Sequence, residues 1–236
     1  MQNYIVAQFM TKKRRSGAGR PEGESFARER ILDAAEATFA DHGYAGTSLR
    51  QIVKRANVTQ ALVTYYFGSK EALFKEVFLR RGRDIAMKRT EALKALRASK
   101  KALKLRDVVA CYIKPALEMR RTREGRSFIR LQARMHTEPP RFAERLRREV
   151  YDHTARDFHA AIREAAPHLS ARTAYWRLVL VIGAYLYAHS DAHRLEKMSG
   201  GLCNTRDLDE MLAQITAFVV GGLGAPEPAR SASALR

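Results

Sequence analysis

Residues 47–70 read TSLRQIVKRANVTQALVTYYFGSK, and this stretch decides the fold of the chain. Apolar residues recur at helical spacing through 49–56, which predicts a first short helix. Asn57 tolerates the left-handed backbone that ends a helix sharply. Thr59 can cap a second helix over residues 60–66. Two short helices joined by a tight turn are the arrangement that delivers one helix into the major groove of DNA.

The second helix has an anchoring side and an outward side. Val63 and Phe67, four residues apart, are expected to hold it to the core. Glutamine can pair with an adenine edge, and leucine or threonine methyl groups can touch thymine. Tyrosine and basic side chains suit phosphates, which fix register without reading sequence. We therefore predict DNA contacts from Thr47, Ser48, Arg50, Thr59, Gln60, Ala61, Leu62, Thr64, Tyr65, Tyr66 and Lys70.

A pair of short helices is also common as a plain hairpin in a helical bundle, so spacing alone leaves DNA binding and simple packing open. Net charge favours the first interpretation. The 236 residues hold 43 Lys and Arg against 25 Asp and Glu, a formal charge of +18. Such a balance favours polyanionic partners, either nucleic acid or an anionic membrane surface. The absence of any long apolar run predicts no membrane span.

Residues 26–75 resemble the tetracycline-repressor (TetR) family of one-component transcription regulators. The resemblance lies in an apolar first helix, then in His42-Gly43-Tyr44, Thr47-Ser48 and Tyr66-Phe67-Gly68-Ser69-Lys70-Glu71-Ala72-Leu73. Asn57 stands where Gly is usual, and Thr64 where Tyr is frequent, which weakens any contact carried over to position 64. The resemblance implies an all-α fold, with an N-terminal three-helix helix-turn-helix DNA-binding domain and a larger helical ligand-binding and dimerisation domain. It also implies double-stranded DNA, a second copy of the chain and a small-molecule effector as partners, and no cofactor.

The chain divides into four regions. Residues 1–25 are basic and Gly/Pro-containing, which predicts a flexible arm that lies on DNA or is merely solvated; Met10 is an alternative start. Residues 26–72 form the predicted DNA-binding domain, 73–223 the effector-binding and dimerisation domain, and 224–236 a disordered tail. Beyond the headpiece we predict helices at about 71–96, 105–120 (interrupted by Pro115), 125–136, 141–165, 171–189 and 207–222.

The helix at 171–189 is apolar around most of its circumference, so it must be buried on more than one side. Packing in a monomer would satisfy this, and so would dimerisation, which the resemblance implies for the last two helices. We predict dimer contacts from Leu178, Ile182, Tyr185, Ile215 and Phe218. Aromatic and Met residues at helical spacing are most often core, but they can line an effector cavity. The candidates are Tyr112, Met119, Phe128, Met135, Phe158 and Trp176.

Segments at 167–169, 174–177 and 183–185 resemble the branch of the family that includes fatty-acid-responsive regulators. This resemblance implies a long apolar effector with an acyl tail and an acidic head.

No phosphate-binding Gly loop, nucleophile elbow or Cys-x-x-Cys pair is present, so we predict no enzymatic site. His189 and His193 flank Asp191 at a spacing that can chelate a metal, but a metal-free pair at a helix end fits better, and we predict no metal. Two cysteines suit a reducing cytoplasm. The acidic residues Asp33, Glu36 and Asp41 are expected to serve only solubility and local pairing.

These patterns predict a homodimeric repressor that a small molecule releases from a palindromic operator. An architectural protein that coats DNA without sequence preference is the main alternative. A helical enzyme or ligand carrier that keeps the headpiece only as a scaffold is a third.

Overall fold

This computed structural model describes residues 22–135, 140–190 and 192–228. Over those residues the chain forms helices and turns with no strand, which confirms the predicted all-α fold. Within the same ranges, no helix is long and apolar enough to cross a membrane. Most of the predicted N-terminal arm and of the C-terminal tail lies outside the described residues.

The predicted helices are found close to their expected limits, and one further helix, α9, was not predicted. The headpiece consists of α1 (Glu22–Gly46), α2 (Leu49–Ala56) and α3 (Gln60–Phe67). The body consists of α4 (Lys70–Ala98), α5 (Leu105–Glu118), the 3-10 turn η1 (Met119–Arg121), α6 (Arg123–Arg134), α7 (Pro140–Ala165), α8 (Ala171–Ser190), α9 (Ala192–Met198) and α10 (Leu208–Gly224).

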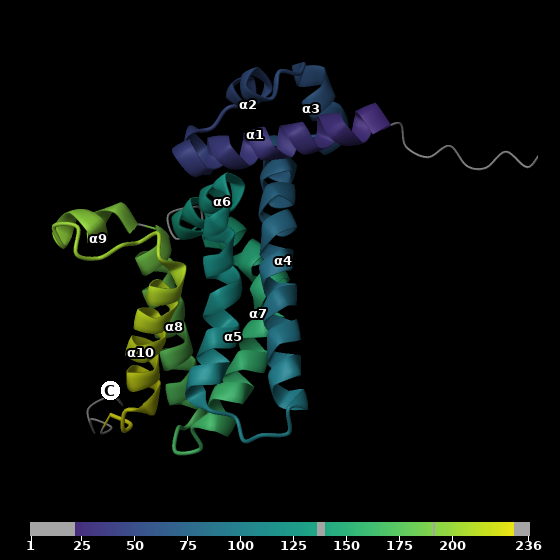
Figure 1. The fold of residues 1–236 in the computed structure, drawn as a ribbon. Coiled ribbons are helices and arrows are strands. Elements are labelled where there is room, and N and C mark those ends of the chain that lie inside the picture. Colours follow the sequence, from purple (N-terminus) through teal and green to yellow (C-terminus); the bar gives the residue numbers. More distant parts are fainter. Residues whose placement is uncertain (1–21, 136–139, 191, 229–236) are drawn as a thin grey trace, which may run out of the picture.

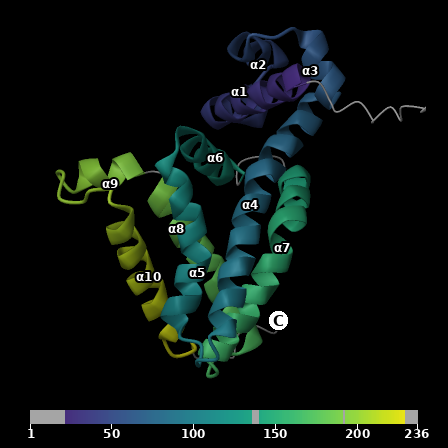
Figure 2. The ribbon, with the colours of Figure 1, turned by 45° about the vertical axis from the view of Figure 1, so that its right-hand side comes forward.

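The headpiece sits at one end of a bundle. Figure 1 shows α1 lying across the upper end of α4, with α2 and α3 on the far side of α1. Helices α5, α7 and α8 run alongside the lower part of α4. Figures 1 and 2 both place α10 at the edge of the body away from α4, and α9 projects outward above it.

Short-range signals explain most helix ends. Gly43 interrupts α1 with a φ of 73°, a left-handed conformation that glycine adopts without a Cβ penalty. Ser69 caps α4, because its hydroxyl accepts a hydrogen bond from the backbone N–H of Ala72 at 3.1 Å. Pro115 lies within α5 instead of ending it, so the helix continues to Glu118 despite the missing N–H.

Two apolar clusters hold the molecule together. One joins the headpiece to the upper parts of α4, α6 and α7; in it Phe39 packs edge-on against Phe74 with ring centroids 4.8 Å apart. The other fills the lower bundle between α5, α7, α8 and α10. Because the first cluster crosses from headpiece to body, packed side chains connect α4 and α6 directly to the headpiece helices.

Gly125 marks the tightest corner of the body, where η1 meets α6. A Cβ on this residue would lie 1.9 Å from the carbonyl oxygen of Met119. Because that neighbour is backbone, it cannot rotate away, and we expect Gly125→Ala to lower the free energy of unfolding by about 3 kcal/mol. Urea unfolding measures the loss. The control is Gly46→Ala, whose Cβ would meet His42 at an ordinary 3.6 Å; equal losses in the two variants would contradict the steric argument.

Candidate nucleic-acid interface and ligand cavity

The α2–α3 unit is built from local caps. Ser48 and Gln51 form a capping box: the Ser48 hydroxyl accepts from the Gln51 N–H, and the Ser48 N–H donates to Gln51 Oε1 at 2.7 Å. Asn57 ends α2 in the left-handed region, at φ 51° and ψ 56°. Thr59 then caps α3 by accepting from the Leu62 N–H at 3.3 Å. These contacts fix the turn that the sequence predicted.

Helix α3 shows one face to solvent and one to the headpiece core. Val63 and Phe67 are buried, as expected of its anchors. Tyr65 is 73% exposed, and Gln60 and Thr64 are exposed beside it. The exposed set among the predicted DNA contacts is Ser48, Arg50, Thr59, Gln60, Ala61, Thr64 and Tyr65.

Three of the predicted DNA contacts, Thr47, Lys70 and Leu62, have side chains that point into the headpiece or pair within it. The Thr47 side chain is buried, and its hydroxyl donates to the carbonyl of Gly43 at 2.7 Å, so it serves the fold. Lys70 Nζ donates to the carbonyl oxygens of Tyr44 and Thr47, both at 2.9 Å, and therefore ties α4 to the α1–α2 turn. Leu62 is half-buried against the headpiece core. Of the remaining predicted contacts, Tyr66 is half-buried, with its ring 5.2 Å from that of the exposed Tyr65.

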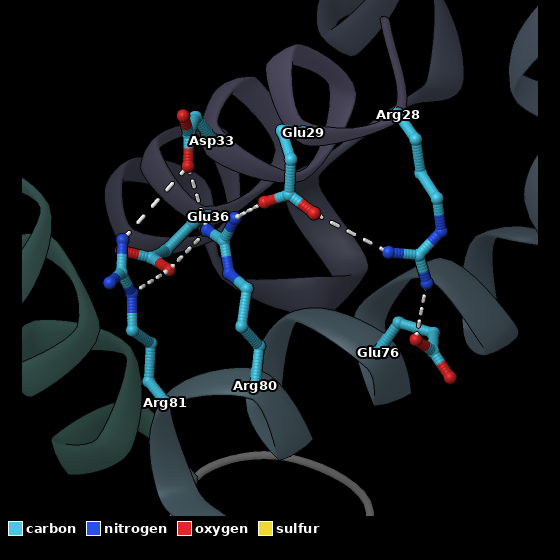
Figure 3. Close-up of polar contacts among 7 residues, drawn as sticks. All are labelled: Arg28, Glu29, Asp33, Glu36, Glu76, Arg80 and Arg81. Carbon is cyan, nitrogen blue, oxygen red and sulfur yellow. Dashed lines mark hydrogen bonds and ion pairs between the residues drawn. The ribbon is translucent and has the colours of Figure 1, made fainter. Parts of the chain in front are cut away.

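A buried carboxylate joins the headpiece to the long helix α4. Glu36 on α1 is 1% exposed, and its Oε2 accepts from Arg80 at 2.9 Å and from Arg81 at 3.1 Å (Figure 3). Arg80 also pairs with Asp33 at 2.8 Å and Glu29 at 3.0 Å. Burial disfavours the charged form of Arg80. The hydrogen bond to Glu36 and the negative charge of Glu36 nevertheless raise the pKa of Arg80 above its ordinary value. The expectation that Asp33 and Glu36 serve only local pairing is wrong, because their arginine partners lie 44 or more residues away in the sequence.

Helix α6 holds the other end of α1. Asp41 pairs with Arg55 of α2 at 3.0 Å and with Arg130 of α6 at 3.2 Å. Arg134 Nη2 donates to the Asp41 carbonyl at 3.2 Å. Partial burial acts to raise the pKa of Asp41, but the hydrogen bond and charges of its arginine partners outweigh it and lower that pKa. Ion pairs therefore attach the headpiece to α4 and to α6.

A cavity of about 360 Å³ opens between α4, α5, α6, α7 and α8. Two of the predicted effector residues, Tyr112 and Met135, line it. Two residues predicted to dimerise, Ile182 and Tyr185, also line it. Arg89 is one of several lining residues that were not predicted from the sequence. Its signal was a lone charge within the apolar stripe of α4, four residues after Ile85 and four before Leu93.

The other predicted effector residues do not line this cavity. Phe128 packs on Phe78 in the cluster that joins the headpiece, with centroids 5.6 Å apart. Phe158 is buried behind Tyr112, at 4.8 Å between ring centroids. Met119 lies in η1, and Trp176 is exposed on the outer side of α8.

Helices α8 and α10 are fastened to each other within one chain. The buried Arg177 donates from Nη1 to the carbonyls of Leu223 and Ala225, both at 2.7 Å, and from Nη2 to Pro226 at 2.8 Å. A cation at the end of α10 satisfies carbonyls that the helix itself cannot. The outer surface of this part of the body is formed by side chains from both helices.

That outer surface, the α8–α10 face, differs from the predicted dimer set. Leu178, Tyr185 and Ile215 are buried within their own chain, so little of these three side chains is open to a partner. Of the predicted set, Phe218 is on the outside, 74% exposed. The large apolar side chains exposed on α8 and α10 are Tyr175, Trp176, Val179, Leu180, Tyr187 and Phe218.

The predicted histidine pair is split between two environments. His189 is buried in α8, whereas His193 is exposed on α9; Asp191 lies outside the described residues. Where side chains are described, no group of three or more His, Cys, Asp or Glu could hold a metal ion.

Two stretches of the chain match families of known proteins. Residues 31–77 match the family described as bacterial regulatory proteins, tetR family, and residues 110–222 match the tetracyclin repressor-like, C-terminal domain. The HTH-type transcriptional regulator BetI of Paraburkholderia xenovorans (strain LB400) is 34% identical over 83 residues, which are 35% of this chain and 42% of BetI. The HTH-type transcriptional regulator RutR of Escherichia coli (strain K12) is 44% identical over 55 residues, 23% of this chain and 26% of RutR. The matches thus span less than half of these curated relatives.

Solved structures share the fold along nearly the whole chain. The fatty acid degradation regulator FadR from Bacillus halodurans aligns with a TM-score of 0.61 and 16% identity, over 87% of this chain and 98% of FadR. A TetR-like transcriptional regulator from Rhodococcus sp. RHA1 aligns with a TM-score of 0.57 and 18% identity, over 88% and 99% of the two chains. The headpiece match, the C-terminal match and the shared fold agree, and the chain belongs to the TetR family of transcription regulators.

Proposed function

We propose that the chain is a sequence-specific DNA-binding transcription regulator that acts as a homodimeric repressor and is released by a small molecule. The observation that carries the proposal is the capped α2–α3 unit at the tip of the molecule, with Gln60, Thr64 and Tyr65 exposed on one side of α3. An exposed helix held by an αL turn and two N-caps matches the geometry of major-groove readers. Because the chain belongs to a family of transcription regulators, the two alternatives, an architectural DNA-coating protein and a helical enzyme, are not favoured.

The α8–α10 face supports the dimer. Its exposed aromatic and aliphatic side chains form a stripe on α8, recurring at positions 176, 180 and 187, with Phe218 on α10 beside it. An apolar surface of this kind is normally covered by a partner. A two-fold dimer would place two copies of α3 about 34 Å apart, the spacing of successive major grooves.

Release would follow from the two attachments of the headpiece. A molecule in the cavity contacts α4 and α6, the same helices that hold α1 through the Glu36 and Asp41 pairs. If the molecule binds better to the headpiece spacing that does not fit the operator, it shifts the population off DNA. The shift can be no larger than its difference in affinity for the two states.

Substitutions on α3 test the assignment of its exposed face. We expect Gln60→Ala to reduce discrimination at one base pair by about 1–3 kcal/mol, because a bidentate base contact is lost. We expect Tyr65→Ala to weaken binding to all duplexes alike, because phosphate contacts carry no sequence information. Fluorescence anisotropy at fixed salt, on an operator and its single-base variants, measures both. The control is Met87→Ala, an exposed side chain on α4 that lies neither on α3 nor on the α8–α10 face; unchanged affinity and discrimination in both α3 variants would remove α3 from the interface.

A further inference from the structure

Arg89 is a buried cation surrounded by neutral groups. Its side chain on α4 is 1% exposed. Nε donates to the Tyr112 carbonyl at 2.7 Å and Nη2 to the Tyr185 hydroxyl at 3.0 Å, while the guanidinium carbon lies 3.7 Å from the Tyr112 ring centroid. Among the described residues no carboxylate lies within ion-pair distance of it. Arginine keeps its charge at every relevant pH, so the site carries an uncompensated positive charge.

The cavity beside Arg89 offers further polar groups at the same end. Gln132 is buried, its Nε2 donates to the Tyr151 hydroxyl at 2.9 Å, and its Oε1 has no hydrogen-bond partner. Burial raises the pKa of Tyr112 and of Tyr151, which keeps both hydroxyls protonated. Phe78, Met135, Ile182 and Leu186 form an apolar part of the wall. The charged side chains on the α7 side of the cavity, Glu144, Arg147, Arg148 and Asp152, are exposed or half-buried. The buried part of the cavity thus combines the Arg89 cation and tyrosine hydroxyls with an apolar wall.

His189, one turn beyond Tyr185, lies in the same positively charged environment. It is buried, and neither ring nitrogen has a hydrogen-bond partner where the structure describes its surroundings. Burial, together with the charges of Arg120 and Arg89, lowers the pKa of His189 to about 3. The ring is therefore neutral at pH 7, and a second positive charge is excluded beside Arg89.

We infer that this cavity binds a small organic acid, and that Arg89 pairs with its carboxylate while the apolar walls take its hydrocarbon body. Burying an unpaired charge is costly, and an anion that enters the site removes that cost. The volume of about 360 Å³ is near the lower end of the range for ligand cavities, which favours a ring or a short chain over a long acyl chain.

The regulatory consequence rests on the proposed function, because it requires an operator to be released. Arg89 lies on the same helix as Arg80 and Arg81, the partners of Glu36 in the headpiece. A carboxylate that draws Arg89 toward the cavity acts directly on the helix that positions α1. The acid is thereby the effector that shifts the headpiece spacing.

Matched pairs of acids and amides test the inference on the full-length protein. The probes are benzoate, phenylacetate, hexanoate and octanoate, each beside its primary amide, with binding measured by titration calorimetry and by the shift in unfolding temperature. We expect at least one acid to bind at least about tenfold more tightly than its amide. In Arg89→Met the acid should bind about tenfold to a hundredfold more weakly, with the amide unchanged, because a charge-assisted hydrogen bond is lost.

Two further variants keep the test decisive. Arg147→Met removes a cation that also lines the cavity but belongs to α7, and it should leave the preference for the acid in place. Arg89→Lys keeps the charge if the Met variant does not fold, and it should retain the preference with weaker binding. The inference is overturned if no acid is preferred over its amide in the wild type, or if Arg89→Met keeps the wild-type preference. Should Arg89→Met not fold, an unchanged affinity of Arg89→Lys for the acid overturns it.

A measurement of operator binding in the absence of ligand distinguishes failure of the proposed function from failure of this inference. A protein that binds acids through Arg89 but selects no operator would keep this inference and lose the proposed function. A protein that binds an operator but shows no Arg89-dependent preference for acids would lose the inference alone.

Discussion

Replacing Glu36 by alanine is expected to lower the free energy of unfolding by about 3 kcal/mol, because breaking a buried ion pair leaves its partner charges without compensation. Glu36 is fully enclosed between α1 and α4, and both Arg80 and Arg81 donate to the same oxygen, Oε2. Arg80 keeps Asp33 and Glu29 as partners after the substitution, which holds the loss at the lower end of the range for buried pairs. Urea unfolding followed by circular dichroism measures it.

The matched control is Glu29→Ala. Glu29 belongs to the same network and pairs with the same Arg80 at 3.0 Å, but its side chain is solvent-exposed. An exposed pair contributes at most about 1 kcal/mol, so we expect a small loss. Hydrogen exchange adds a local readout: the amides of α1 should lose protection in Glu36→Ala and keep it in Glu29→Ala. Equal, small losses in both variants would show that Glu36 does not fasten the headpiece.

If the chain is the proposed homodimeric repressor, the substitution Phe218→Glu is expected to convert it to a monomer and to weaken operator binding by at least about a hundredfold. Phe218 lies on the α8–α10 face, and in a two-fold interface each change occurs twice, so two carboxylates would be buried near each other. Burying an unpaired charge costs several kcal/mol, and each monomer would then hold a single half-site. Sedimentation velocity gives the oligomeric state, and anisotropy on the operator gives the affinity.

Met87→Glu is the control for added charge alone. Met87 is 53% exposed on α4, away from the α8–α10 face, and should tolerate the carboxylate without change in mass or affinity. If Phe218→Glu still sediments as a dimer and binds the operator as well as Met87→Glu, the interface must lie elsewhere.

Much of the headpiece could be predicted because its signals are local. Ser48, Asn57 and Thr59 act on backbone groups within five residues, so the turn and both short helices follow from the printed order of residues. The anchors Val63 and Phe67 follow from helical spacing in the same way. The exposed face of α3 was predicted largely as the complement of those anchors.

What escaped prediction depends on contacts between distant residues. Glu36 looks like an ordinary surface charge in the sequence, and the only signal for Arg89 is its place in the apolar stripe of α4. The approach of α1 to α4, and of α4 to α5 and α8, buries both. For α8, apolar side chains cover most of the helix, so periodicity could not tell which face looks inward. Tyr185, predicted as a dimer contact, is buried, and Trp176, predicted to line the effector cavity, is exposed.

The central claim is that the chain binds a specific operator through α3. It is tested most directly when the purified full-length protein selects duplexes from a random DNA pool at about physiological salt. We expect an enriched palindromic motif, two half-sites about one helical turn apart, which Gln60→Ala blurs at one position in each half. Recovery of all sequences alike, with affinity that falls steeply as salt rises, would contradict the claim. The +18 charge, and not α3, would then account for binding.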